Sequence, residues 1–199
     1  MNRREAIQRV AMLIGGSVIG ANLFLEGCTR PATKDVATLF EKDTINFLGD
    51  LAEAILPETS TPGAKEAGVG EFIPVMIRDC YDPHDQKAFL EGLGEVDERA
   101  KQEFGKKFQE LSKDEQLQFV NMLDKEAKQF QNERGQKQSE LPDDAAPLPN
   151  HFFHMLKQIT LTGFFTSEVG MTRALRYVKI PGRYDGNYPY KKGDKAFAS

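Results

Sequence analysis

The chain has 199 residues and a net charge of −4, with 40% hydrophobic and 28% charged residues. This length suits a single domain, and the balance of apolar and charged residues is typical of a globular protein. An acidic chain lacks the basic face that phosphates require, which argues against a nucleic-acid partner. The two cysteines, Cys28 and Cys80, are too few for a disulfide framework and belong to no CxxC or CxxCH motif.

Residues 1–27 have the organisation of an export signal. Arg3, Arg4 and Arg9 precede an apolar stretch, Val10–Leu25, that several glycines interrupt. A charged start and a short apolar core are typical of a signal peptide, and this stretch is short for a membrane span. The pair Arg3-Arg4 resembles a twin-arginine signal, which exports folded proteins, although such signals usually carry Ser or Thr before the pair. An ordinary secretion signal or an amino-terminal membrane anchor is the alternative.

The sequence Leu25-Glu26-Gly27-Cys28 resembles a lipoprotein box, although Glu26 is unusual at its position. In such a box Cys28 becomes the first residue of the mature protein and carries lipid. Its acyl chains would hold the protein on a membrane surface without a spanning helix. Cleavage nearby, with no lipid on Cys28, is the alternative. Residues 28–43 are predicted to form a tether and the start of the first helix.

Residues 36–56 carry apolar side chains at three- and four-residue spacing, which predicts an amphipathic helix. Pro57 is expected to end this helix, and Thr44 could cap a restart within it. The segment 57–70 is rich in turn-forming residues and completes neither a phosphate-binding nor a dinucleotide-binding motif. It is therefore predicted to be a structural loop.

Two further helices are predicted over residues 71–81 and 85–104. Cys80 lies at the end of the first, as a small packed residue or, after export, as a disulfide partner of another chain. Gly105 is expected to end or bend the second.

Ser112 and Glu115 have the spacing of a capping box, which predicts the start of another helix. The residues of this helix predicted to face the core are Leu117, Val120, Leu123, Ala127 and Phe130. Residues 131–146 are polar and lose the helical periodicity, which predicts an exposed connection. The next helix is expected to begin at Leu148 or Pro149.

His151 and His154 are three residues apart and share a face of that helix. Zinc or iron can use such a pair, and an independent metalloenzyme that uses these residues with His84 is one interpretation of the chain. No accompanying carboxylate pattern is present. Packing of both histidines in the core or an interface is the other interpretation.

The helix is expected to break at Gly163, after which Thr166 or Ser167 caps a short helix through Val178. From Pro181 the chain is expected to run as an extended arm. Arginines lie among aromatic residues here, a mixture typical of interface cores. The candidate partner-binding residues are Phe164, Phe165, Arg176, Tyr177, Arg183, Tyr184, Tyr188 and Tyr190. The predicted fold is all-α: a single irregular multi-helix domain with long loops over residues 44–180, followed by the arm, 181–199.

Two groups of motifs flank the generic middle helices. The first consists of Ile55-Leu56-Pro57, Thr61–Ala64, Ala67–Val69 and Phe72, and the second of Gly163–Gly170, Ala174–Tyr177, Pro181–Gly186 and Pro189-Tyr190. Together with the twin arginines, these motifs resemble the gluconate 2-dehydrogenase subunit 3 family over residues 44–195.

The resemblance implies a non-catalytic small subunit of a membrane-associated sugar or polyol dehydrogenase. It implies a large FAD-dependent partner of the GMC oxidoreductase type, often with a cytochrome c subunit that carries haem c, and no cofactor in this chain. Such partners usually lack an export signal, so the twin-arginine translocase would carry both subunits to the periplasm as a folded complex. Lipid on Cys28 would depart from the simplest members, so attachment to the membrane through lipid or through the complex stays open. A structural lipoprotein without a redox partner is the remaining alternative.

Overall fold

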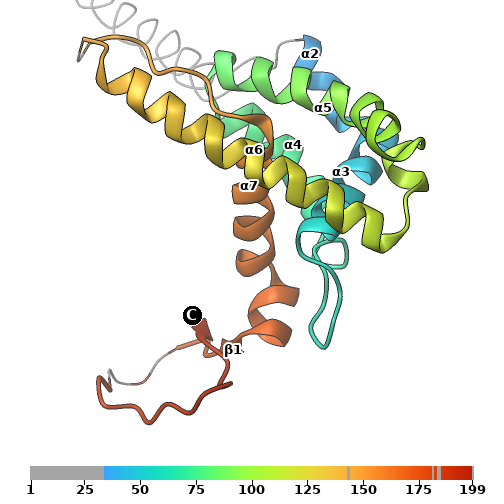
Figure 1. The fold of residues 1–199 in the computed structure, drawn as a ribbon. Coiled ribbons are helices and arrows are strands. Elements are labelled where there is room, and N and C mark those ends of the chain that lie inside the picture. Colours follow the sequence, from blue (N-terminus) through green and yellow to red (C-terminus); the bar gives the residue numbers. More distant parts are fainter. Residues whose placement is uncertain (1–33, 143, 181, 183–184, 199) are drawn as a thin grey trace, which may run out of the picture. The chain divides into compact units, whose positions relative to one another are not determined.

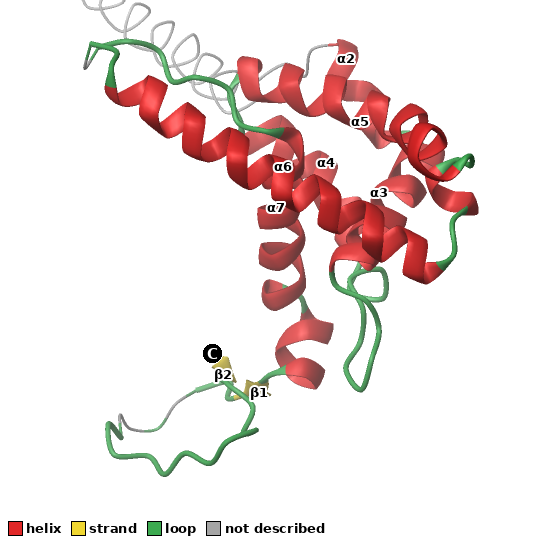
Figure 2. Ribbon diagram, viewed as in Figure 1, coloured by secondary structure: helices red, strands yellow, loops and turns green. Residues whose placement is uncertain are grey.

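The computed structural model describes residues 34–198 except 143, 181 and 183–184. The predicted export signal, with Arg3, Arg4 and Cys28, therefore lies outside the described residues. The described part is mainly helical, which confirms the predicted all-α fold (Figures 1 and 2). Its elements are α2 (Lys34–Ala37), η1 (Thr38–Phe40), α3 (Lys42–Ile55), α4 (Val69–Cys80), α5 (Pro83–Phe104), η2 (Phe108–Glu110), α6 (Lys113–Ser139), α7 (Phe152–Thr166), η3 (Gly170–Ala174), β1 (Arg176–Tyr177) and β2 (Phe197–Ala198). None of the described helices is both long and apolar enough to cross a membrane.

Helix α7 lies at the centre of this arrangement, because it contacts α3, α4, α5 and α6. Its neighbours bury eight of its fifteen residues, which explains the large apolar side chains on the buried face of this helix. The buried residues of α7 are Phe152, Phe153, Met155, Leu156, Ile159, Thr160, Gly163 and Phe164. The direction of α7 also fixes the start of the C-terminal residues, because the chain passes from α7 through η3 into β1 (Figure 1).

Local stop and start signals in the sequence predicted several helix ends correctly. Helix α3 ends at Ile55, two residues before Pro57, and α5 ends before Gly105, which adopts a positive φ of 75°. The capping box is present: the Glu115 N–H donates to Oγ of Ser112 (3.3 Å), and the Ser112 N–H donates to Oε2 of Glu115 (2.8 Å). Thr44 was predicted wrongly as a cap, since it lies inside α3 behind the N-cap residue Glu41.

Three predictions about burial were wrong. Leu117 and Phe130 of α6 are exposed, and the neighbouring Phe119 is buried instead, packed between the rings of Phe104 and Phe108. Cys80 is exposed at the end of α4, with Sγ 3.9 Å from Sδ of Met76, and is not a packed core residue.

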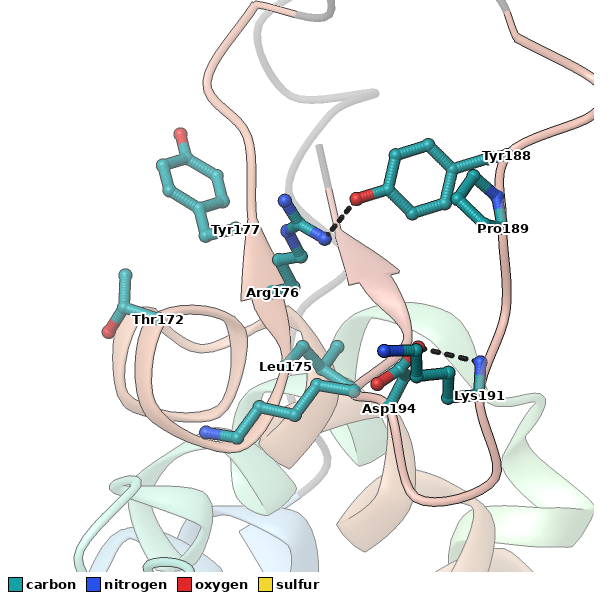
Figure 3. A pocket seen from close by; sticks show the side chains of 9 residues that line it. Thr172, Leu175, Arg176, Tyr177, Tyr188, Pro189, Lys191 and Asp194 are labelled. Carbon is teal, nitrogen blue, oxygen red and sulfur yellow. Dashed lines mark hydrogen bonds between the residues drawn. The ribbon is translucent and has the colours of Figure 1, made fainter.

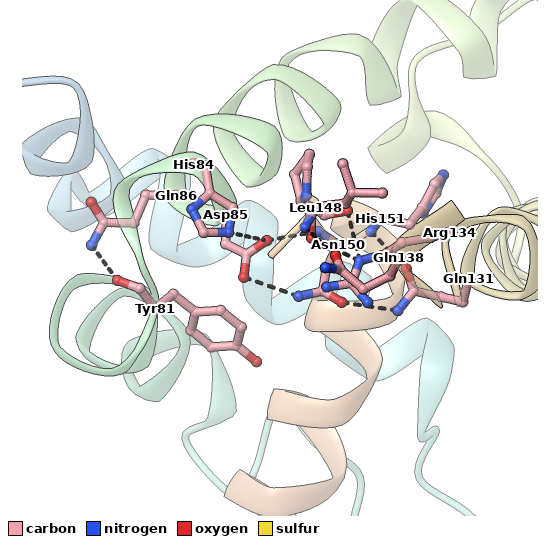
Figure 4. Close-up of polar contacts among 11 residues, drawn as sticks. Tyr81, His84, Asp85, Gln86, Gln131, Arg134, Gln138, Leu148, Asn150 and His151 are labelled. Carbon is pink, nitrogen blue, oxygen red and sulfur yellow. Dashed lines mark hydrogen bonds and ion pairs between the residues drawn. The ribbon is translucent and has the colours of Figure 1, made fainter. Parts of the chain in front are cut away.

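The prediction of a connection over residues 131–146 was wrong for its first half, because α6 continues to Ser139. Polar side chains one turn apart on this part of α6 bind the backbone that precedes α7. Arg134 donates from Nε to the carbonyl of Leu148 (2.8 Å), and Oε1 of Gln138 accepts from the Leu148 N–H (2.8 Å) (Figure 4). The spacing of Arg134 and Gln138 therefore has the period of a helix. Because both side chains are polar, a search for apolar periodicity does not detect this helix.

Helix α7 begins at Phe152, later than predicted, and continues through Gly163 to Thr166. Gly163 does not break the helix because its missing side chain makes room for Phe72 of α4. A Cβ atom on Gly163 would lie 2.7 Å from Cδ1 of Phe72. The predicted cap at Ser167 is confirmed: its Oγ accepts from the Gly170 N–H (2.9 Å). The turn that follows is a π-helical turn that ends at Ala174, before the predicted Val178.

Two buried polar residues in the first turn of α5 connect three helices. Asp85 accepts from the backbone N–H of Asn150 (2.7 Å) and from its side-chain amide (2.9 Å), which fixes the start of α7. Gln86 donates from Nε2 to the carbonyls of Ile77 (3.0 Å) and Tyr81 (3.1 Å), which closes the end of α4 (Figure 4). The ends of α4, α5 and α7 are thus held together by groups that would otherwise be buried without partners.

We expect Asp85→Ala to lower the free energy of unfolding by about 2–3 kcal/mol, because it leaves two partly buried donors of Asn150 without an acceptor. Chemical denaturation of the domain measures the change. The matched control is Glu95→Ala, which removes an exposed carboxylate from the same helix and should change stability by less than about 0.5 kcal/mol. Equal effects of the two substitutions would contradict the role of Asp85.

The two glycines of α5 should respond in opposite directions to alanine. Gly94 has open space where a Cβ would lie, so Gly94→Ala should stabilise the domain by about 0.5–1 kcal/mol through helix propensity. A Cβ on Gly92 would overlap the ring of Phe152, which is buried in the first turn of α7. Gly92→Ala should therefore destabilise by about 1 kcal/mol or more. Thermal unfolding of both variants beside the wild type distinguishes these signs, and stabilisation by Gly92→Ala would contradict this packing.

Candidate partner interface

The residues from Gly170 to Ala198, called the C-terminal segment below, are held together around Arg176. The guanidinium carbon of Arg176 lies 4.8 Å from the centre of the Phe197 ring and 5.4 Å from that of Tyr188. Nη1 of Arg176 also donates to the hydroxyl of Tyr188 (2.6 Å) (Figure 3). The two rings contact each other edge to face at 5.2 Å. One cation thus joins side chains 12 and 21 residues further along the chain.

A short parallel pairing of β1 with β2 supports this contact. The Arg176 N–H donates to the carbonyl of Ala196 (2.8 Å), and the Val178 N–H donates to that of Ala198 (2.8 Å). The sequence predicted an extended arm from Pro181; its described residues contain turns at 186–187 and 192–193, and its end returns to the start of the segment. The return requires contacts that only the folded chain brings together.

The segment surrounds an open depression of about 840 Å³ (Figure 3). Its lining is formed by Thr172, Leu175, Arg176, Tyr177, Tyr188, Pro189, Lys191, Asp194 and Lys195. Asp194 is the single carboxylate among these residues, and it accepts from the backbone N–H of Lys191 (2.8 Å). The depression therefore combines aromatic rings with an excess of positive charge.

The predicted partner-binding residues differ in how far the structure exposes them. Phe165 on α7 is 42% exposed, as is Tyr177 (43%) on β1. Phe164 is only 2% exposed and packs in the core of the chain itself, so it is removed from the candidate surface. The helical period explains the difference, because adjacent residues of a helix project about 100° apart, so Phe164 faces the core while Phe165 reaches the surface. Arg176, Tyr188 and Tyr190 are exposed, whereas Arg183 and Tyr184 lie outside the described residues.

Several exposed residues of this surface were not among those predicted. Leu161 lies one helical turn before Phe165 on α7, beside a second hollow of about 380 Å³ that Met76 and Tyr81 also line. Ile180 and Phe197 are exposed in the C-terminal segment as well. The four-residue spacing of Leu161 and Phe165 is a signal that the sequence carried, whereas nothing local marks the position of Phe197.

The predicted histidine pair contributes to the fold. His151 is the N-cap residue of α7, where its Nδ1 accepts from the Phe153 N–H (3.2 Å). Its Nε2 lies 3.4 Å from Oε1 of Glu126, which also pairs with Arg99. His151 thus joins α5, α6 and α7.

The environment lowers the pKa values of three side chains in this region, those of His151, Glu126 and His154. Burial lowers the pKa of His151, against the opposing effect of Glu126, and so favours the neutral ring that can act as a cap. The hydrogen bond from Arg99 lowers the pKa of Glu126. His154 is partly buried and its pKa is also lowered by burial. Among the described residues, no three His, Cys, Asp or Glu side chains gather in a way that could hold a metal ion.

The comparison with known families decides the identity of this helical domain. The family described as gluconate 2-dehydrogenase subunit 3 matches residues 42–182. The chain belongs to the gluconate 2-dehydrogenase subunit 3 family. No curated protein and no solved structure matches the chain.

The motifs that carry the family resemblance occupy distinct places in this subunit 3 domain. The first group spans the end of α3, the loop that follows and the first turn of α4, and the carboxylate of Glu53 in α3 accepts from the loop N–H groups of Glu58 (2.7 Å) and Lys65 (2.8 Å). The second group covers the end of α7, η3 and β1. An ion pair between Arg173 of η3 and Glu66 joins the two regions. This ion pair therefore links the loop that carries part of the first group to the start of the C-terminal segment, which carries part of the second.

We expect Arg176→Ala to release the end of the C-terminal segment without unfolding the helices. The substitution removes the contacts to Tyr188 and Phe197, worth about 1–2 kcal/mol in total. Chymotrypsin cleavage after the aromatic residues of the segment should become about 5- to 30-fold faster, while helical circular dichroism stays unchanged. Lys179→Ala, which removes an exposed neighbouring cation, is the control and should cleave like the wild type. Equal cleavage of the Arg176 variant and the wild type would contradict the anchoring role.

Proposed function

We propose that this chain is a non-catalytic small subunit that binds, stabilises and co-exports the FAD-dependent large subunit of a sugar or polyol dehydrogenase. The observation that carries the proposal is the exposed aromatic and arginine surface of the C-terminal segment in a member of a dehydrogenase subunit family. In this proposal FAD lies in the large subunit, of the GMC oxidoreductase type, and substrate oxidation takes place there. A cytochrome c subunit with haem c is the proposed electron acceptor.

The proposed contact surface consists of side chains that are costly to leave in water. Phe165 on α7 and the exposed residues Tyr177, Tyr188 and Tyr190 of the C-terminal segment form it, together with Arg176. Tyrosine and arginine are enriched at the energetic centres of interfaces because they combine a large contact area with hydrogen-bonding groups. We include Arg183 and Tyr184 on the basis of the sequence. Burial of this surface by the partner would stabilise both subunits.

The proposed route of export follows from the amino-terminal sequence. The pair Arg3-Arg4 would direct the chain to the twin-arginine translocase, which carries folded proteins. A large subunit without its own signal would cross in the same complex and reach the periplasm. Lipid on Cys28 would then hold the complex at the membrane surface.

Replacing Arg3 and Arg4 by lysine should leave both subunits in the cytoplasm, because the large subunit would depend on this chain for export. The measurement is immunodetection of both chains in periplasmic and cytoplasmic fractions, with flavin fluorescence of the large chain as a second readout. Arg9→Lys is the matched control, since it changes an arginine of the same segment and preserves the pair. Periplasmic amounts in this control should equal those of the wild type.

Two outcomes would contradict the proposal. A large subunit that reaches the periplasm with the Arg3→Lys/Arg4→Lys variant would show that co-export is wrong. A tagged wild-type chain that purifies from the periplasm alone and colourless, without a yellow flavin-bearing partner, would show that the chain is no dehydrogenase subunit in this cell.

A further inference from the structure

Charge is distributed unevenly along the chain. Residues 34–170 contain 15 Lys and Arg and 26 Asp and Glu, a net charge of −11. Residues 171–199 contain seven Lys and Arg and two Asp and Glu, a net charge of +5. The acidic composition of the whole chain therefore conceals a basic C-terminal segment. The argument against a nucleic-acid partner used the net charge of the whole chain and does not apply to this segment alone.

Within the described residues, the cations of this segment are mostly not neutralised by carboxylates. Arg173 pairs with Glu66, and it is the one cation of the segment with a described ion pair. The exposed cations without such a pair among the described residues are Arg176, Lys179, Lys191, Lys192 and Lys195. Most lysines that pair elsewhere in the described chain do so on the helices, as Lys157 does with Asp124 (2.7 Å). The segment thus presents net positive charge to its surroundings.

The basic segment also has a defined shape. The pairing of β1 with β2 and the contacts of Arg176 hold Tyr188 and Phe197 in place, and Tyr188 lines the depression of about 840 Å³ (Figure 3). Ile180 is 80% exposed and Tyr190 is 76% exposed on the same segment. A tail that serves solubility alone needs lysines but not ordered aromatic rings. Fixed rings among unpaired cations are the composition of a surface that binds another macromolecule.

We propose that the C-terminal segment docks on an acidic face of the large subunit; this inference rests on the proposed function and adds the charge of the partner's face. An acidic partner face attracts the segment of charge +5 and repels the helices of charge −11. The opposed charges orient the chain during encounter, so that the segment and the adjoining end of α7 meet the partner first. After contact, the exposed aromatic residues supply the apolar area that electrostatic attraction alone does not.

A membrane of anionic lipids would also attract these cations, and it is the competing partner. A protein partner fits the segment better for two reasons. A fluid bilayer has no fixed shape that a preformed depression with aromatic walls would match. A side chain that protrudes from a protein has a fixed shape and can fill such a depression. The guanidinium of Arg176 also lies against the rings of Tyr188 and Phe197. It therefore maintains the shape of the segment and is less accessible to a lipid headgroup.

The experiment compares two triple charge reversals in the full chain, expressed with its large subunit. The test variant is Lys191→Glu/Lys192→Glu/Lys195→Glu. The matched control, Lys106→Glu/Lys113→Glu/Lys125→Glu, makes the same change in net charge with exposed lysines of the helical part. The dissociation constant of each purified complex is measured by dilution at about 50 mM and about 300 mM NaCl, between which the screening of charges rises strongly.

For the wild type and the control we expect the dissociation constant to rise about tenfold or more between the two salt concentrations. The test variant should bind about tenfold or more weakly than the control at low salt and show little further loss at high salt. Helical circular dichroism of the isolated variants should match the wild type. Full neutralisation, Lys191→Gln/Lys192→Gln/Lys195→Gln, should give an intermediate affinity.

The outcomes separate failure of this inference from failure of the proposed function. If no complex forms with the wild-type chain at either salt concentration, the proposed function itself is wrong. If the complex forms but the test variant binds as tightly as the control, the inference is overturned and the proposed function stands. If the wild type sediments with phosphatidylglycerol vesicles and the test variant loses only this binding, the segment serves the membrane, and the inference is likewise overturned.

Discussion

The hydrogen bonds between Asp85 and Asn150 are the constraint on which the rest of this domain depends. They join residues 65 positions apart and bring the first turn of α5 to the start of α7. Helix α7 contacts four other helices and leads directly into η3, so its starting point determines both the core and the direction of the C-terminal segment. Because Asp85 is buried, its carboxylate has no solvent to replace Asn150, and the pairing is strongly selective for this one arrangement.

The same principle recurs at the other end of α7, in a weaker and more exposed form. Arg176 joins β1 to Tyr188 and Phe197, much as Asp85 joins α5 to Asn150. An exposed cation between two rings contributes less than a buried carboxylate with two donors, since water competes for the cation. The helical domain is therefore held by buried polar contacts, and the C-terminal segment by contacts that a partner could reinforce or rearrange.

What the sequence predicted and what it missed follow from the range of the interactions. The sequence predicted the end of α3 just before Pro57 and the capping box of Ser112 and Glu115, because both depend on neighbours within four residues. The continuation of α6 to Ser139 depends on contacts with the backbone near residue 148, so a polar sequence concealed a helix. Gly163 signalled a break by propensity, but its packing against Phe72 determines the outcome. The exposure of the candidate interface was predicted for Phe165 and wrong for Phe164, because the exact face of α7 depends on tertiary contacts.

For a subunit that assembles with its partner, as we propose, an ordered arm has a physical advantage. A disordered arm of more than twenty residues would lose conformational entropy on docking and so weaken the complex. Arg176 and the pairing of β1 with β2 restrict the segment beforehand, which reduces this loss. The segregation of charge acts at an earlier stage, since it biases the orientation of encounter over a distance of about a Debye length. Together, preorganisation and steering favour fast and correctly oriented assembly, which the proposed export of a folded complex would require.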